Sequence, residues 1–263
     1  MMRLARIALG VSVALVLAYL MLPLLIIAPI SFSGARFLSF PPPSFSLRWY
    51  QEFFGNPAWM QATRVSLSVG LSTVVLATPL GVAAAYAIAN ARNRLMRAVH
   101  VALMLPLLVP IIILAIGVFF VYAKLGLVAT LPGLVLANVM LGLPYVVISV
   151  VAGLQTFDRT QEMVARSLGM NRLRSFMAVT LPQIKASVVA GAIFAFISAM
   201  DETIIALFVS GGQYQTLTKR MFTALRDEID PTIAAISSLL TAASFVLVLL
   251  AMRGRQRAAA SSD

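Results

Sequence analysis

The sequence predicts an all-α polytopic membrane protein with six transmembrane helices. Of its 263 residues, 60% are hydrophobic and only 11% are charged, and the mean hydropathy is +0.95. Soluble globular domains carry about 25% charged residues, so this composition excludes a soluble fold. Uncharged runs also alternate with short basic segments. Several of these runs exceed the roughly 20 residues that a helix needs to cross a hydrocarbon core.

The apolar runs define the six expected spans. These are Ile7–Ile30, Val65–Asn90, Val99–Tyr122, Leu134–Leu154, Val188–Val209 and Thr232–Met252. Prolines inside several spans predict kinks, which suit a transporter and are also ordinary packing features. We expect three parts: 1–63 with the first helix and an outer interfacial segment, 64–253 with a five-helix core and a basic loop at 155–187, and a disordered tail at 254–263.

The interfacial segment follows the first span. Three consecutive prolines at 41–43 end regular structure there. Aromatic residues then gather in the next stretch, as they do at a membrane–water boundary; they are Trp49, Tyr50, Phe53, Phe54 and Trp59. We interpret this stretch as an interfacial helix, with contact to a partner protein as the alternative.

The charged residues set the orientation and exclude several function classes. Thirteen lysines and arginines flank the side that holds both termini and seven flank the other, so both termini are expected in the cytoplasm. The net charge of +11 is not gathered on an aromatic-interleaved domain, so no nucleic-acid partner is expected. The chain has no cysteine and one histidine, which excludes disulfides, thiolate metal sites and paired-histidine metal ligation, and we expect no metal site.

The basic loop between the fourth and fifth spans contains a helix–glycine–helix pattern. Asp158 can cap a first helix, Gly169 ends it, Asn171 starts a second helix, and Pro182 marks the next boundary. Each helix has an apolar face, and the loop carries Arg166, Arg172 and Arg174. This pattern is typical of a docking element for a soluble partner. The alternative is an amphipathic surface helix without a partner.

The run from Ala165 to Gly169, followed by Leu181 and Pro182 twelve and thirteen residues after the glycine, resembles the EAA loop of binding-protein-dependent ABC importer permeases. The resemblance implies a type I ABC importer permease fold, whose loop forms coupling helices in a groove of an ATPase. The usual Glu-Ala-Ala falls on Met163 to Ala165, with Glu162 one residue early. The implied ATPase-coupling residues are Glu162, Ala165, Arg166, Ser167, Leu168, Gly169, Met170, Asn171, Leu181 and Pro182.

The fifth expected span carries two adjacent acids, Asp201 and Glu202. Buried carboxylates are costly when unpaired, and ionisable residues inside membranes usually face a bundle interior or an aqueous cavity. Our hypothesis is that Asp201, with Ser198 and Glu202, lines the substrate pathway. Successive residues of a helix point about 100° apart, so at most one acid faces squarely into a narrow pore. Alternatively, one carboxylate pairs with an arginine or caps a kink.

The stretch from Ser198 to Glu202, together with Phe208–Gly212 and Tyr214, is similar to spermidine/putrescine permeases, particularly the second of their two membrane subunits. This resemblance implies a cationic polyamine or a related organic amine as cargo. The outer loop at 211–231 contains Tyr214 and Gln215 and could meet a periplasmic substrate-binding protein. Its acids, Asp227, Glu228 and Asp230, are equally consistent with a solvated loop.

The chain contains no glycine–lysine P-loop, so we expect no cofactor on it and no enzymatic activity of its own. The resemblance implies a cytoplasmic ABC ATPase dimer that binds ATP and Mg, a second homologous permease and a periplasmic binding protein, all at a bacterial inner membrane whose lipid surrounds the chain. Two alternatives stay open. One is an autonomous secondary transporter or channel with Asp201 as a proton or ion site. The other, a membrane enzyme, is disfavoured because no glycine-flanked serine elbow is present.

Overall fold

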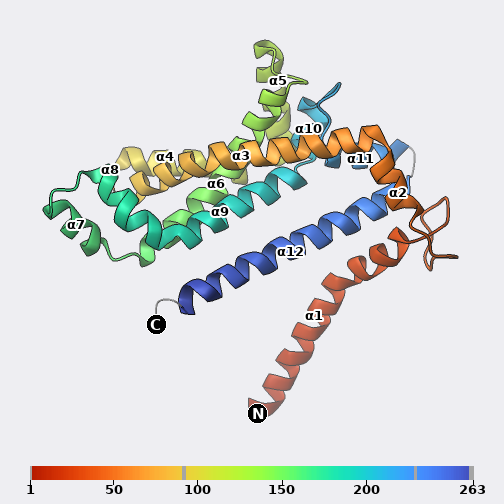
Figure 1. Ribbon diagram of the computed structural model, residues 1–263, viewed down its shortest axis with the longest axis horizontal. Helices are drawn as coiled ribbons and strands as arrows, with labels where there is room; N and C mark the ends of the chain where they lie inside the picture. The colour runs from red at the N-terminus through yellow and green to blue at the C-terminus, as the bar shows by residue number, and fades with distance from the viewer. Residues whose placement is uncertain (1, 91–92, 228–229, 261–263) are drawn as a thin grey trace. The chain divides into compact units, whose positions relative to one another are not determined.

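The computed structural model describes residues 2–90, 93–227 and 230–260, and within these ranges it is helical and contains no extended strand (Figure 1). The predicted all-α class is confirmed. The elements are α1 (Met2–Ser31), α2 (Arg48–Gly55), α3 (Pro57–Asn90), α4 (Arg94–Leu108), α5 (Ile111–Leu125), α6 (Leu131–Thr156), α7 (Arg159–Ser167), α8 (Arg172–Ser175), the π-helix η1 (Phe176–Thr180), α9 (Leu181–Asp201), α10 (Ile204–Val209), α11 (Leu217–Asp227) and α12 (Thr232–Ala260).

The chain divides into two compact units, which are described separately. One comprises residues 1–60 and 221–253, and the other comprises residues 61–220 and 254–263. In the first unit, the amphipathic helix α2 buries Trp49 and Phe53. The Phe53 ring lies 6.5 Å from the ring of Trp59. Trp59 was expected in the interfacial helix with the other aromatic residues, but it belongs to α3. Residues 254–260 of the tail, expected to be disordered, continue α12, and 261–263 lie outside the described residues.

Most expected spans match helices of sufficient length. Over the described residues, four helices are long and apolar enough to cross a membrane: Leu9–Ser31, Pro57–Asn90, Leu131–Thr156 and the continuous stretch Arg172–Asp201. The bent pair α4 and α5 makes a fifth candidate, and α12 begins with a shorter apolar run at Thr232–Val246. Six helical positions therefore correspond to the six expected spans.

The third expected span, Val99–Tyr122, is not one kinked helix. Helices α4 and α5 meet at 106°, with Val109 and Pro110 between them. Val109 has a ψ of 133°, the extended conformation that a following proline imposes by excluding the helical region. The break at Pro110 is consistent with the proline positions in the sequence, but its sharpness was not predicted.

The second unit is built on close packing between α6 and α9, which lie side by side in Figure 1. Small residues allow this approach. A Cβ added at Gly191 would lie 2.9 Å from the Cα of Val146, and one added at Gly142 would lie 3.2 Å from the Cβ of Ala195. Glycine and alanine at such contacts bring membrane helices within van der Waals range of each other's backbone.

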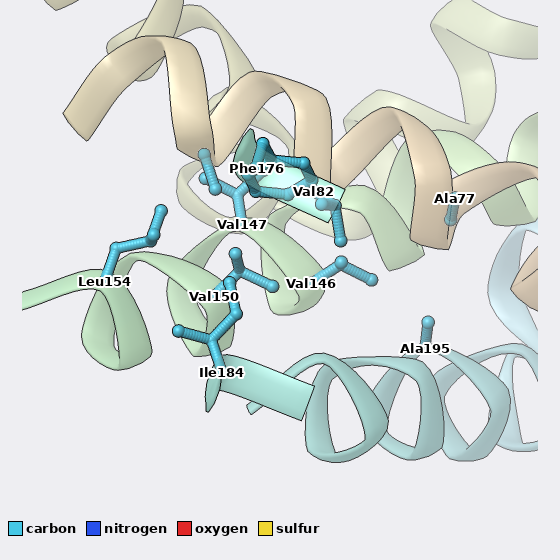
Figure 2. Packing of buried hydrophobic residues seen from close by; sticks show 10 residues of the cluster. Ala77, Val82, Val146, Val147, Val150, Leu154, Phe176, Ile184 and Ala195 are labelled. Atoms are coloured by element: carbon cyan, nitrogen blue, oxygen red, sulfur yellow. The ribbon is translucent and has the colours of Figure 1, made fainter. Parts of the chain in front are cut away.

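An apolar cluster fills the space between α3, α6 and α9 (Figure 2). Its α6 side consists of Val146, Val147, Val150 and Leu154, all buried. Ala77, Val82 and Ala85 of α3 and Ile184 and Ala195 of α9 complete it. Phe176 of η1 joins it at the end near the basic loop. The loop helices therefore rest on a packed three-helix core.

Candidate functional site

Local capping builds the basic loop as the sequence predicts. The Asp158 carboxylate accepts a hydrogen bond from the Thr160 N–H at 2.9 Å, and this bond lowers the pKa of Asp158. Gly169 follows α7 with a φ of +93°, a conformation that favours glycine. The Asn171 side chain then accepts from the Arg174 N–H at 2.8 Å and starts α8. The predicted helix–glycine–helix arrangement is confirmed.

The expected boundary at Pro182 is a change of helix type and not an end of helical structure, because η1 ends at Thr180 and α9 begins at Leu181. Helical structure is continuous from Arg172 to Asp201, with the π-helical turn Phe176–Thr180 just before the proline. Pro182 occupies the first turn of α9, where proline's fixed φ is suitable and its missing N–H is tolerated. The second loop helix therefore extends directly into the membrane helix α9.

Glu162 points into the protein. Only 8% of its surface is exposed. The Tyr86 hydroxyl of α3 donates to one carboxylate oxygen, and the Thr180 hydroxyl of η1 donates to the other at 2.7 Å. The Ser175 hydroxyl donates to the Glu162 carbonyl at 3.1 Å. The carboxylate is therefore engaged inside the chain, in hydrogen bonds to α3 and η1.

The outward side of the loop is apolar and basic. Among the expected coupling residues, Ala165 is buried with Glu162, Met170 and Leu181 are half-buried, and the exposed ones are Arg166, Ser167, Leu168, Gly169, Asn171 and Pro182. Large apolar side chains outside the implied set of coupling residues are exposed as well; they are Met163, Val164, Leu173 and Met177. Helical spacing placed Val164, Leu173 and Met177 on apolar faces, whereas no spacing signal pointed to Met163. Leu168 is 79% exposed. We call all these exposed residues of the loop, the coupling residues and the apolar ones together, the outer face of the loop.

The second candidate region is a cavity of about 540 Å³ in the same unit. Helices α4, α5, α6 and α9 and the breaks at Val109 and Glu202 contribute its walls. It is lined by Pro106, Leu107, Val109, Ile111, Leu141, Tyr145, Phe194, Ile197, Ser198, Asp201 and Glu202. The structure thus brings the three expected pathway residues to one cavity and adds two aromatic rings, from Tyr145 and Phe194, that the sequence analysis did not include.

The two acids have different environments. Helix α9 ends at Asp201, so the expected unbroken span Val188–Val209 is wrong. The Glu202 side chain accepts from the Ile205 N–H at 2.6 Å and thereby caps α10, while the Thr218 hydroxyl donates to the Glu202 carbonyl at 3.0 Å. Capping a break is the alternative role weighed for one carboxylate. Asp201 is exposed, and its carboxylate has no hydrogen-bond or ion-pair partner among residues 2–90, 93–227 and 230–260.

The outer loop holds α10 from its other end. The Lys219 ammonium donates to the Ser210 carbonyl at 2.5 Å and to the Leu207 carbonyl at 3.4 Å, and burial lowers the pKa of Lys219. Tyr214 and Gln215 are half-buried. The expected loop at 211–231 contains α11, Asp227 pairs with Arg226 at 2.9 Å, and Glu228 lies outside the described residues.

Comparison with known proteins agrees with this architecture. Residues 77–258 match the family model described as "Binding-protein-dependent transport system inner membrane component". The spermidine/putrescine transport system permease protein PotC of Haemophilus influenzae is 30% identical over 89% of this chain and 91% of its own. PotC of Escherichia coli strain K12 is 27% identical over 93% of this chain and 92% of its own.

A solved structure shows the same fold. It is a chain of a bacterial alginate ABC transporter in complex with an alginate-pentasaccharide-bound periplasmic protein, with a TM-score of 0.74, 13% identity, and coverage of 97% of this chain and 94% of that chain. The resemblance to ABC importer permeases is confirmed. The chain is a membrane permease subunit whose ATPase is a separate subunit, which decides against an autonomous transporter or a membrane enzyme. This protein belongs to the family of binding-protein-dependent transport system inner membrane components.

Proposed function

We propose that this permease carries a small organic amine of the polyamine class and that Asp201 meets the cargo in the cavity. The observation that carries the proposal is an exposed carboxylate that has no partner in the described part of the chain, on the wall of a cavity that Tyr145 and Phe194 also line. A carboxylate attracts an ammonium group, and aromatic rings attract cations within about 6 Å of their centres. The relatives named for spermidine and putrescine transport support this cargo class.

The rest of the cavity wall suits an alkyl amine. Its other lining residues are mostly apolar, including Leu107, Leu141 and Ile197. Methylene groups can contact these side chains while an ammonium group stays near Asp201. A single carboxylate matches a single ammonium group, so a di- or triamine needs further acceptors. We propose that a second, homologous permease supplies them from its own wall of the pathway.

The outer face of the loop supports docking to a cytoplasmic ABC ATPase dimer. Exposed apolar clusters usually mark interaction surfaces, and Leu168, Leu173 and Met163 are 79%, 68% and 58% exposed. Arg166, Arg172 and Arg174 of the same loop are exposed and suit an acidic groove rim. We propose that the ATPase, and not this chain, binds ATP and Mg. The distribution of positive charge supports cytoplasmic termini and a cytoplasmic loop.

The transport cycle follows from the continuity of the second loop helix with α9. ATP-driven closure of the ATPase dimer moves the loop, and α9 carries this motion over its 21 residues, about 30 Å, to Asp201. The cavity then opens outward and receives cargo from a periplasmic binding protein. Tyr214 and Gln215 are half-buried and support the turn, while the exposed Gln213 and Gly212 form its accessible edge toward that protein.

The test is uptake of spermidine and putrescine by proteoliposomes that contain the complete complex. The Asp201→Asn variant should raise the half-saturating concentration about tenfold, since a hydrogen bond to a charged group contributes about 1.5–3 kcal/mol and exposure weakens it. Asp227→Asn is the matched control, because it removes the same charge from an exposed site outside the cavity. Unchanged uptake by Asp201→Asn at limiting polyamine, or import of anions in place of amines, would refute the cargo proposal.

A further inference from the structure

We propose that Glu162 is a positioning residue that makes the loop helix α7 move together with α3 and α9, and that it thereby sets how much cargo is moved for each ATP hydrolysed. This inference rests on the proposed docking of an ATPase to the outer face of the loop. Glu162 itself faces away from that surface and is 8% exposed. Its role is therefore argued from contacts inside this chain.

Glu162 joins three elements through one carboxylate. It belongs to α7, its two oxygens accept from Tyr86 of α3 and from Thr180 of η1, and its carbonyl accepts from Ser175 at the end of α8. We call these four residues the Glu162 latch. Tyr86 and Glu162 are separated by 76 positions in the chain. The latch is thus a tertiary connection between the loop and two different membrane helices.

Neighbouring contacts stiffen the same junction. The rings of Tyr86 and Phe176 have centroids 4.6 Å apart, and Phe176 lies in the π-helical turn. The Arg172 guanidinium lies 5.2 Å from the centre of the Tyr86 ring. The Arg159 guanidinium, at the start of α7, donates to the Ala89 carbonyl near the end of α3 at 2.8 Å. A displacement of the outer face is therefore transmitted to α3 and α9 through these packing contacts and hydrogen bonds.

A glutamate is specifically suited to this position. A buried carboxylate is costly unless its oxygens are satisfied, and here two hydroxyl donors satisfy them. The carboxylate only accepts, so it fixes the direction in which both hydroxyls point. Glutamine keeps the length and one strong acceptor, and its amide can donate to a rotated hydroxyl. Alanine would leave both hydroxyls without their acceptor and release the loop from the two helices.

The experiment compares variants in the assembled complex in proteoliposomes, with ATP hydrolysis and cargo uptake measured on the same preparation. Glu162→Ala should raise the number of ATP molecules hydrolysed per cargo molecule about tenfold, because a loop that is released from α3 and α9 lets hydrolysis proceed without moving them. Tyr86→Phe, which removes one donor, should raise it about threefold, and Glu162→Gln should restore most of the wild-type ratio. Thr156→Ala is the matched control, because it removes a side-chain hydrogen bond that stays within α6, from the Thr156 hydroxyl to the Gly153 carbonyl.

The result that overturns the inference is an unchanged ratio in Glu162→Ala, or hydrolysis and uptake that decrease together in proportion to assembled complex, since that indicates a role in folding only. If Glu162→Ala does not assemble, Tyr86→Phe gives the decision. A second measurement separates this from docking: the chain has no cysteine, so Leu168→Cys provides a unique crosslinking site. Failure of that crosslink to the ATPase refutes docking, whereas a normal crosslink with an unchanged ratio refutes the Glu162 latch alone.

Discussion

Gly169 offers a perturbation whose cost can be worked out from the structure. Its φ is +93°, and a Cβ added there would meet no heavy atom within 4 Å. The cost of a side chain is therefore conformational and not steric, about 1–2 kcal/mol for a residue forced into the left-handed region. The turn also closes α7, since the Gly169 N–H donates to the Arg166 carbonyl at 3.0 Å and the Met170 N–H donates to the Ala165 carbonyl at 3.2 Å.

Two substitutions separate conformation from size. Gly169→Ala should weaken the association with the ATPase about tenfold, because 1.4 kcal/mol spent on restoring the turn is a factor of ten in the binding constant. Gly169→Asn should weaken it less, since asparagine enters the left-handed region several-fold more often than most residues. Gly117→Ala is the control: Gly117 lies inside α5, and its added Cβ also meets open space, so only a gain in helix propensity is expected.

The assay is a titration of the solubilised permease with its ATPase, followed by stimulated ATP hydrolysis at saturation. The Ala and Asn variants should differ in the binding midpoint and agree at saturation. A wild-type midpoint for Gly169→Ala would show that the turn does not position the docking surface. An Asn variant as weak as the Ala variant would show that the left-handed backbone is not the cause.

Three further outcomes are expected. Gly191→Leu should lower the melting temperature of the purified chain, because a Cβ alone approaches the Val146 Cα to 2.9 Å and overpacking costs about 1–3 kcal/mol. Glu202→Ala should slow uptake at saturating cargo by releasing the α10 cap, worth about 0.5–2 kcal/mol, and Glu202→Gln should restore it. The pKa of Asp158 is lowered from its ordinary value of 3.8 in the folded chain. Its cap therefore stabilises α7 fully at pH values above 3.8, and this stabilisation is lost as the pH falls through the lowered pKa of the folded chain. Protease cleavage in the loop should rise over that window in the wild type and stay flat in Asp158→Asn.

Local chemistry explains why the basic loop could be predicted from the sequence. Asp158, Gly169 and Asn171 act on residues two or three positions away, through a cap, a left-handed turn and a second cap. Such signals need no knowledge of the rest of the fold. The six apolar spans could be located in the sequence for the same reason, because the length and hydropathy of a span are properties of a single segment.

Features that depend on contacts between distant residues could not be predicted from the sequence. The inward direction of Glu162 is set by Tyr86 and Thr180, 76 and 18 positions away, and no spacing rule connects them. Tyr145 and Phe194 share the cavity with Asp201 only because α6 packs against α9 through small residues. Hydropathy also treats Val99–Tyr122 as one run, although Pro110 divides it into two helices at 106°.

The three acids Glu162, Asp201 and Glu202 show how a structural carboxylate differs from one that is available to cargo. Glu162 and Glu202 are 8% and 9% exposed. The Glu162 carboxylate accepts hydrogen bonds from two hydroxyls, and the Glu202 carboxylate accepts one from a backbone N–H in the first turn of α10. Both carboxylates are costly to change, because the groups that donate to them would lose an acceptor. Asp201 is exposed at the cavity with its carboxylate unoccupied in the described part of the chain. Of the three, it is therefore the acid whose charge a cation can satisfy without breaking a contact that the fold requires.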